Sequence, residues 1–304
     1  MRLITCCTLG AALAAVPALV GPSQVQSGKL DTAKIDEITK LPGTWNVQEG
    51  VYKVTAPRSD VKVNVDGWSM PPFMGLTSWA AFQAGTKAPA MVMGDLVLFQ
   101  DEVNPVMSAL LDAGVSVTAL HNHFFFDEPK VYFMHLGGEG KTEELAAGVR
   151  KALDVVKQIR DAAPEPKKSS GAAVLPSTSS IDGKPIDVIL GAKGQAKDGM
   201  YKVVIGRNVK SACGCGVGKE MGVNTWAAFA GSPDHALVDG DFVTFDGELQ
   251  PVLKALRKAG IAIVAIHSHM EGESPKAIFL HYWGVGGAEE LARGVKSALD
   301  VQKP

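Results

Sequence analysis

The chain contains the same unit twice. Residues 94–155 align with residues 240–301 without a gap, at a constant shift of 146 positions, and 30 of these 62 positions are identical. With small gaps the match extends upstream, where "MGLTSWAAF" returns as "MGVNTWAAF" and "GVYKVTAPR" as "GMYKVVIGR". A unit of about 125 residues is long enough to enclose its own hydrophobic core. The repeat therefore predicts two related domains rather than a solenoid of short repeats.

The segment between the two units has the composition of a linker. Residues 161–180, "DAAPEPKKSSGAAVLPSTSS", are rich in Pro, Ser and Ala and show no hydrophobic periodicity. We therefore expect the first domain to span residues 28–160 and the second to span residues 181–304.

The N-terminal residues have the layout of a Sec signal peptide, which we assign to residues 1–23. An early Arg2 precedes a short apolar run, and Val16 and Ala18 suit the −3 and −1 positions of a cleavage after Ala18. The apolar run is too short for a membrane span, although an uncleaved anchor is the alternative. Cys6 and Cys7 come too early in the run for lipidation. We expect a periplasmic or secreted protein without a lipid anchor.

Hydrophobic patterning predicts the elements of each unit. In the first unit we expect strands at residues 90–99, 115–123 and 130–136, and helices at residues 104–114 and 141–156. The first of these helices has Pro105 in its first turn and ends at Gly114. The order strand, helix, strand, strand, helix follows several earlier strands. It predicts an α+β class, with helices packed on one face of a mixed or antiparallel sheet.

Histidines follow the repeat. Of the seven histidines in the chain, six form two matching sets, which are His121, His123 and His135 in the first unit and His267, His269 and His281 in the second. Neighbouring positions differ freely between the copies, as Asn122 and Ser268 do. Both copies have thus kept the pattern His-x-His followed by a third histidine.

Strand geometry predicts that the three histidines of a unit meet. His121 and His123 point to the same face, because side chains alternate along a strand. If His121 lies opposite Phe133 in a hairpin, His135 falls on that face too, one diagonal step away. A slip of one residue would send His135 to the other face.

A carboxylate is expected beside each histidine set. In a strand–helix–strand crossover, the two strands run parallel and end at the same edge of the sheet. Glu102, with its counterpart Glu248, follows the first strand, and the histidine pair ends the second. We therefore expect Glu102 and Glu248 to be a fourth ligand or a general base. The alternative role is to stabilise the helix dipole.

Three neutral imidazoles suit a divalent transition metal, zinc foremost, with copper, iron or nickel as alternatives. Such a set leaves an open coordination position, at which a carboxylate could activate bound water. Two alternatives to a metal site stay open. One is a metal-free acid–base site of His and Glu, and the other is a set of hydrogen-bonding histidines in the sheet or at the domain interface.

Two cysteines belong to the second unit alone. Cys213 and Cys215 lie in "SACGCGVGKE", where the first unit reads "VKVNVDG". A pair of soft thiolates would favour Cu(I) or zinc, so we count both as candidate metal ligands. A labile disulfide or two inert thiols are the alternatives.

Several of these segments resemble the LppY/LpqO family of exported bacterial proteins, a domain of unknown function. The resemblance lies in "GVYKVTAPRSDVKVNVDG", "MGDLVLFQDEVNPVMSALL" and "ALHNHFFFDEPKVYFMH", together with "GDFVTFDGELQPVLKALRKAGIAIVAIHSHM" and "PKAIFLHYWG" in the second unit. It covers nearly all of the chain after the signal peptide. It implies a bacterial, exported protein with one or two copies of the domain, and it brings no established activity.

The leading hypothesis is an exported metal-binding protein with one histidine site per domain or one site shared between them, either a metal-dependent hydrolase or another metalloenzyme. The alternative is a non-catalytic protein that carries metals in the envelope or binds a small-molecule or protein partner there. The formal net charge is −2, and the chain has no long basic run, so nucleic acid is not an expected partner.

Overall fold

The structure of the protein is a computed structural model that describes residues 30–172 and 174–303. The predicted signal peptide, with Cys6 and Cys7, lies outside the described residues. No helix among the described residues is long and apolar enough to cross a membrane.

The first domain contains three α-helices, one 3-10 helix and nine strands. In chain order they are α1 (Thr32–Thr39), β1 (Gly43–Asn46), β2 (Val51–Pro57), β3 (Asn64–Val65), β4 (Trp68–Ser69), η1 (Pro72–Met74), β5 (Thr77–Ala84), β6 (Ala90–Phe99), α2 (Gln100–Asp112), β7 (Ser116–His121), β8 (Asp127–Glu128), β9 (Val131–Gly140) and α3 (Thr142–Ala162).

The second domain repeats this order. Its elements are α4 (Gly183–Leu190), β10 (Gln195–Lys197), β11 (Met200–Gly206), β12 (Val209–Lys210), β13 (Gly216–Val217), η2 (Lys219–Met221), β14 (Asn224–Gly231), β15 (Ala236–Thr244), α5 (Leu249–Lys258), β16 (Ala262–His267), β17 (Ile278–Gly286) and α6 (Ala288–Leu299).

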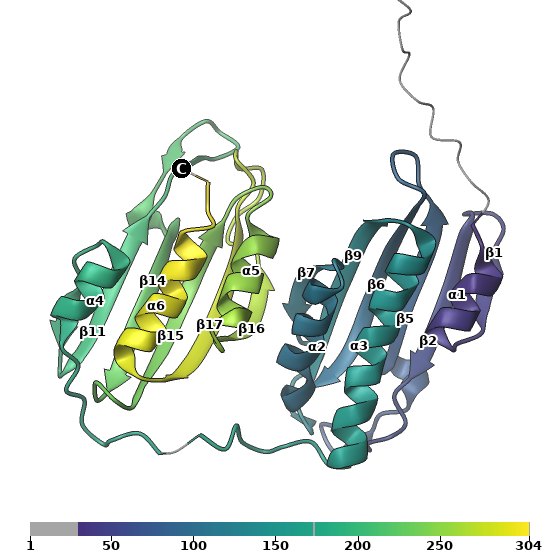
Figure 1. The fold of residues 1–304 in the computed structure, drawn as a ribbon, viewed down its shortest axis with the longest axis horizontal. Coiled ribbons are helices and arrows are strands. Elements are labelled where there is room, and N and C mark those ends of the chain that lie inside the picture. The colour runs from purple at the N-terminus through teal and green to yellow at the C-terminus, as the bar shows by residue number, and fades with distance from the viewer. Residues whose placement is uncertain (1–29, 173, 304) are drawn as a thin grey trace, which may run out of the picture.

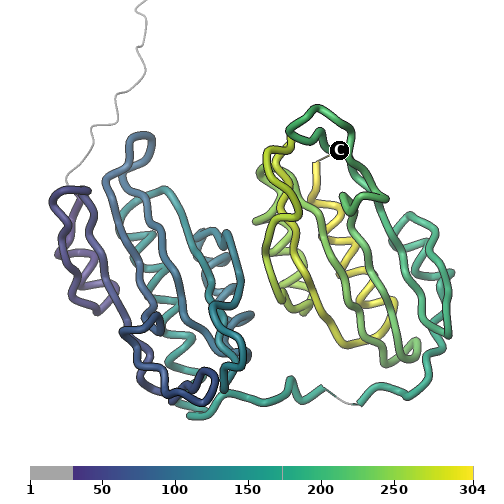
Figure 2. Tube along the Cα trace, turned by 180° about the vertical axis from the view of Figure 1, so that it is seen from behind, coloured from purple at the N-terminus to yellow at the C-terminus, as the bar shows by residue number. Residues whose placement is uncertain are grey.

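Twelve of the strands form one sheet, in the order β1-β2-β5-β6-β9-β7-β16-β17-β15-β14-β11-β10. Neighbouring strands in this order pair antiparallel throughout. Figure 1 shows the α-helices labelled in it on one face of the sheet, and Figure 2 shows the opposite face, which no α-helix of the described residues covers. The predicted α+β class and the two tandem domains are confirmed.

Hydrophobic side chains pack on both faces. On the helix side, one buried cluster includes residues of both domains. On the other face, each domain has a smaller cluster, built around Phe133 in the first and Phe279 in the second. In the first domain, Val63, between the end of β2 and the short strand β3, belongs to this cluster, and in the second domain Val209 of β12 and Val217 of β13 do.

Helix α2 begins four residues before its predicted start. Glu102 lies in the first turn, and its carboxylate accepts a hydrogen bond from the N–H of Phe99 at 2.9 Å, which satisfies a free donor at the helix start. Asp101 adds a second negative charge there, which the helix dipole favours. Pro105 therefore lies inside the helix rather than in its first turn.

The domains meet along their edge strands in a reciprocal way. Leu120 of β7 pairs with Ile266 of β16, its counterpart in the repeat. On one side of this pair, the Asn104 amide exchanges two hydrogen bonds with the backbone of Ile263, at 3.1 and 2.8 Å. On the other side, Gln250 and the backbone of Val117 make the same exchange, at 2.7 and 3.0 Å. Asn104 and Gln250 are repeat counterparts, as are Val117 and Ile263. The domains are thus related by an approximate two-fold axis.

Candidate metal centres

Strand register brings the three histidines of the first domain to one face, as predicted. His121 of β7 lies opposite Phe133 of β9, and His135 lies opposite Ala119. On its other side, His135 faces Asp95 of β6. The helix side of β7 carries Val117 and Leu120, which belong to the large core, so the histidines lie on the face without α-helices.

Two imidazoles of the first domain approach each other closely. The Nε2 atoms of His121 and His123 are 3.2 Å apart. The His123 ring stacks on the ring of Phe133, with centroids 3.4 Å apart and planes 4° apart. The His135 ring stacks on that of His121 at a centroid distance of 5.2 Å. Phe133 therefore fixes the plane of one ring and His135 lies beside the other.

The second domain repeats this arrangement. The Nε2 atoms of His267 and His269 are also 3.2 Å apart, and the His269 ring stacks on Phe279 at 3.5 Å. The His281 ring stacks on that of His267 at 4.8 Å. Two copies that differ in their flanking residues therefore arrive at the same geometry.

The structure adds one residue to each set that sequence reasoning missed. The carboxylate of Asp95 lies 4.0 Å from His135 Nε2, and that of Asp241 lies 3.4 Å from His269 Nε2. Both aspartates are buried, and Oδ1 of each has no hydrogen-bond partner. A buried carboxylate oxygen without a partner costs free energy. A signal was present in the sequence, because an acid interrupts the same apolar strand in both repeats.

Burial sets the protonation of these groups. It raises the pKa of Asp95 and of Asp241 above the usual range, against the opposing effect of the nearby histidines. It lowers the pKa of His121, His123 and His267. The imidazoles with lowered pKa are therefore neutral near pH 7. The contact between His269 and Asp241 is short enough for an ion pair, but burial raises the pKa of Asp241 and so favours its neutral form, and we therefore do not count the contact as a stabilising charge pair.

The histidine and aspartate side chains of each set lie near one another, but their nitrogen and oxygen atoms do not surround one point at which a metal ion could bind. Among residues 30–172 and 174–303, no three His, Cys, Asp or Glu groups are arranged to hold a metal ion as they stand. In each domain the two Nε2 atoms are in place, whereas the third ring lies parallel to the first. His135 is 38% exposed at its side chain, so its ring has room to turn about its side-chain torsions.

The two histidine sets lie close to the domain junction. Because Leu120 pairs with Ile266, His121 and His267 are diagonal neighbours on adjacent strands, for which the usual separation is about 7–8 Å.

The structure does not bring Glu102 to the histidines. Glu102 is fully buried and accepts two hydrogen bonds from Arg58, at 2.8 and 3.0 Å, and Arg160 Nε lies 3.0 Å from Oε1. Strands β6 and β7 are parallel, as expected, but β9 lies between them, which separates Glu102 from the histidine pair. The expected position of Glu102 beside the histidines was wrong.

Glu248 has the same structural role in the second domain. Its carboxylate accepts hydrogen bonds from Arg207 and from the N–H groups of Phe245 and Lys303. These contacts lower the pKa of Glu248 although burial opposes them. A carboxylate held in this way is a poor general base.

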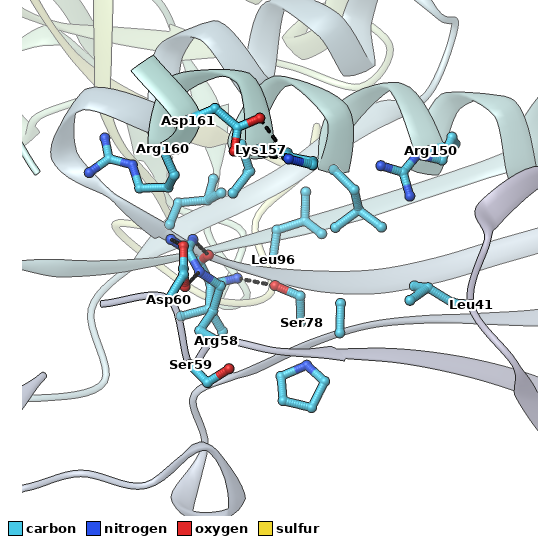
Figure 3. A pocket seen from close by; sticks show the side chains of 16 residues that line it. Leu41, Arg58, Ser59, Asp60, Ser78, Leu96, Arg150, Lys157, Arg160 and Asp161 are labelled. Carbon is cyan, nitrogen blue, oxygen red and sulfur yellow. Dashed lines mark hydrogen bonds and ion pairs between the residues drawn. The ribbon is translucent and has the colours of Figure 1, made fainter. Parts of the chain in front are cut away.

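A cavity of 370 Å³ lies near Glu102 in the first domain. Figure 3 shows that Arg58, Arg150, Lys157 and Arg160 approach it from β2 and α3, together with apolar side chains such as Leu96. Each positive charge has an acidic partner: Glu102 and Asp60 for Arg58, Asp154 for Arg150, Asp161 for Lys157 and Asp101 for Arg160. This compensation leaves little charge for an anionic ligand.

The structure places Cys213 and Cys215 at the exposed tip of the β12–β13 hairpin, whose Val209 and Val217 belong to the same buried cluster as Phe279. Their Sγ atoms are 2.8 Å apart and share a hydrogen bond. That bond, with a second one from Ser211, lowers the pKa of Cys213 to about 7.

Comparisons with known proteins bear on the family rather than on the activity. No curated protein matches the chain. The trimeric bacterial microcompartment shell protein PduB is 12% identical over 85% of this chain and 89% of its own, with a TM-score of 0.22. The double ringed trimeric shell protein MSM0271 from the RMM microcompartment is 13% identical over 82% and 93%, with a TM-score of 0.18. At such TM-scores two chains need not share a fold.

One family matches the chain twice. It is described as a Domain of Unknown Function (DUF1259), and the matches cover residues 33–155 and 184–301. These two ranges fall within the two structural domains and include all six repeated histidines. The chain therefore belongs to this family of uncharacterised domains and contains two tandem copies of it.

Proposed function

We propose that the protein binds a divalent transition metal, zinc foremost, at one site in each domain. In the first domain the ligands are His121, His123 and His135, with Asp95 as fourth ligand or as the hydrogen-bond partner that orients a ligand. In the second they are His267, His269, His281 and Asp241. The observation that carries the proposal is the distance of 3.2 Å between the paired Nε2 atoms in both domains.

That distance fits two ligands of one ion. With zinc–nitrogen bonds of about 2.0–2.1 Å and a tetrahedral angle, two ligating nitrogens are about 3.3 Å apart. Closure of the site requires the third histidine of each set to turn its ring toward the other two. The half-exposed side chain of His135 allows such a turn.

A hydrogen bond between two imidazoles would give the same distance, but it would leave the buried carboxylate beside each pair without a role. The carboxylates of Asp95 and Asp241 favour the metal. Each is buried beside histidines with one oxygen unpaired, an arrangement that a cation would stabilise. A pair of histidines that only hydrogen-bond to each other would not require a buried carboxylate beside them.

The donor set also limits the metal. Imidazole nitrogen with one carboxylate oxygen suits zinc, iron, nickel and Cu(II) and is a poor match for Cu(I), which prefers sulfur. Asp95 replaces Glu102 as the candidate base in a hydrolytic reaction, since its raised pKa and its free oxygen suit proton transfer from a bound water. Hydrolysis is therefore the second candidate function, and metal storage or delivery without turnover is its alternative.

The location of the protein is part of the proposal. The signal-like residues 1–23 and the motifs similar to the LppY/LpqO family support export to the periplasm or the medium without a lipid anchor. The mass of the protein recovered from the periplasm of an expressing bacterium tests this. Cleavage after Ala18 is expected, and a chain that keeps its N-terminus in the membrane fraction would contradict it.

Elemental analysis of protein made without a histidine tag tests metal binding. We expect about two metal ions per chain, one per domain. His121→Ala and His267→Ala should each halve the content, and the double variant should abolish it. The matched control is His235→Ala, which changes the seventh histidine, outside both sets, and should leave the content unchanged.

Two results would oppose the proposal. One is metal-free protein after dialysis against zinc followed by gel filtration. The other is a metal content that the double variant does not change. A panel of ester and phosphoester substrates then separates the two candidate functions: turnover that disappears in Asp95→Asn/Asp241→Asn favours hydrolysis, and stoichiometric metal without turnover favours storage or delivery.

A further inference from the structure

We propose that Cys213 and Cys215 form a thiol–disulfide exchange site that reacts with accessible disulfides of small molecules and of other proteins. The site uses none of the residues that we propose as metal ligands, and it lies on a different element of the fold, the β12–β13 hairpin. The first domain has no cysteine at the matching hairpin, so the activity belongs to the second domain alone.

The hairpin holds the two sulfurs together and exposes them. Its base is anchored by buried Val209 and Val217 and by a pair of backbone hydrogen bonds between Lys210 and Ser274, at 2.9 and 2.8 Å. Its tip turns at Gly214, whose φ of 81° is readily adopted only by glycine. Both cysteines are exposed, so a substrate disulfide can reach them.

The tip is closed by its own hydrogen bonds. Ser211 N–H donates to the Cys215 carbonyl at 2.9 Å, and Gly214 N–H donates to the Ser211 carbonyl at 2.8 Å. These bonds direct the side chains of Cys213 and Cys215 to the same side of the turn, with their sulfurs 2.8 Å apart. Two inert surface thiols would not require a turn that brings their sulfur atoms together.

Cys213 is the attacking residue. Its sulfur has two neighbours able to donate a proton to a thiolate, Ser211 Oγ at 3.1 Å and Cys215 Sγ at 2.8 Å. Hydrogen bonds to a thiolate stabilise it, and the thiolate is the nucleophile in exchange. Cys215 then lies within reach of the sulfur that has reacted.

The reaction runs in two balanced steps. The Cys213 thiolate attacks one sulfur of the substrate disulfide, which forms a mixed disulfide and releases the other half as a thiolate that takes a proton from water. Cys215 loses its proton and attacks the Cys213 sulfur. This forms the Cys213–Cys215 disulfide and releases the second half as a thiol. The two protein thiols are oxidised, and the substrate disulfide is reduced to two thiols.

The product disulfide is easily reduced. It closes a loop with a single residue between the cysteines, so it gains little from restriction of the unfolded chain. Exposed or strained disulfides have the more oxidising potentials and are the labile ones. The oxidised hairpin therefore passes its disulfide on to other thiols, and the site works in both directions.

The test uses glutathione disulfide as substrate and the full chain with Cys6→Ser and Cys7→Ser, so that every thiol signal comes from the hairpin. After acid quenching, intact mass identifies the protein species and a thiol assay counts the glutathione released. We expect an internal disulfide without adduct and two glutathione molecules per chain. Cys215→Ser should stop at the mixed disulfide on Cys213 and release one. Millimolar reduced glutathione should return the disulfide fully to thiols.

The control is Cys213→Ser/Cys215→Ser, which should release no glutathione. The proposal fails if the thiols stay reduced after prolonged exposure to glutathione disulfide. It also fails if the protein with both cysteines accumulates two glutathione adducts, because the thiols would then react independently. Neither result would affect the metal centres, whose ligands are unchanged in all of these variants.

Discussion

Arg58 donates two parallel hydrogen bonds to the buried carboxylate of Glu102, from Nη1 to Oε2 at 2.8 Å and from Nη2 to Oε1 at 3.0 Å. The pair joins the end of β2 to the first turn of α2, 44 residues later in the chain. Bidentate pairing of this kind fixes geometry as well as charge. Glu102 therefore joins two elements of the first domain and lies away from the histidines.

Glu102→Gln should destabilise the first domain without loss of metal. The variant leaves two buried arginines without a full counter-charge, which costs about 3–5 kcal/mol. The melting temperature of the first domain should fall by about 10 °C, as measured by calorimetry. Glu248→Gln is the matched control and should cost less, because its partner Arg207 is more exposed. A stable Glu102→Gln protein that has lost its metal would return Glu102 to the metal site.

Asp95→Asn should weaken metal binding in the first domain by about 10–100-fold, as measured by competition with a chromophoric chelator. Without metal the variant should be at least as stable as the unchanged protein, because an unpaired buried carboxylate oxygen costs free energy. A purely structural aspartate would give the opposite pattern, with lower stability and unchanged affinity.

Metal removal should lower thermal stability. At a free zinc concentration about 100 times the dissociation constant, binding to the folded state alone adds about 2.7 kcal/mol. A chelator should therefore lower the melting temperature, and added zinc should restore it. In His121→Ala/His267→Ala the chelator should have no effect, and an equal shift in that variant would show that zinc acts at another place.

Alkylation of Cys213 should depend on pH with a midpoint of about 7. The lowered pKa means that the thiolate is present above this pH and is lost below it. At pH 7 about half of the Cys213 thiol is ionised, compared with about 3% for a thiol with a pKa of about 8.5. Iodoacetamide rates between pH 5.5 and about 9 measure the profile. Cys215→Ser keeps a hydrogen-bond donor and should retain a low midpoint, whereas Cys215→Ala should raise it.

Amide hydrogen exchange should reveal the reciprocal contacts at the junction. Gln250→Ala removes the acceptor of the Val117 N–H and should speed exchange there by about three- to tenfold. Asn104→Ala should do the same for the Ile263 N–H. Each variant is the control for the other. Acceleration at both amides in either variant would mean that the domains separate as a whole.

Self-comparison of the sequence predicted much of this structure. It identified both domains, and the alternation of side chains along a strand predicted that His135 shares a face with His121 if His121 lies opposite Phe133, which is the register of the sheet. Such predictions succeed because they depend on neighbouring segments, in which register follows from the hydrophobic pattern.

Long-range placement was harder to predict. The position of β9 between β6 and β7 brings Asp95 opposite His135 and takes Glu102 away from the histidines. Strand order in a sheet depends on packing across the whole domain, which no short pattern records. The early start of α2 has a local cause, the capping contact of Glu102 with Phe99. Predicting that start would have required the assignment of Glu102 to the first turn of the helix.

The reciprocal contacts at the junction carry a consequence for a single copy of the domain on its own chain. Each domain offers the same edge strand and a side-chain amide at the same position, so one copy can form this interface with a second molecule of itself. Such a homodimer would dissociate on dilution, whereas the fused chain stays assembled at any concentration. Fusion into one chain also allows the two domains to acquire different sequences. The cysteine pair, present in one half only, is the kind of divergence that a homodimer could not evolve.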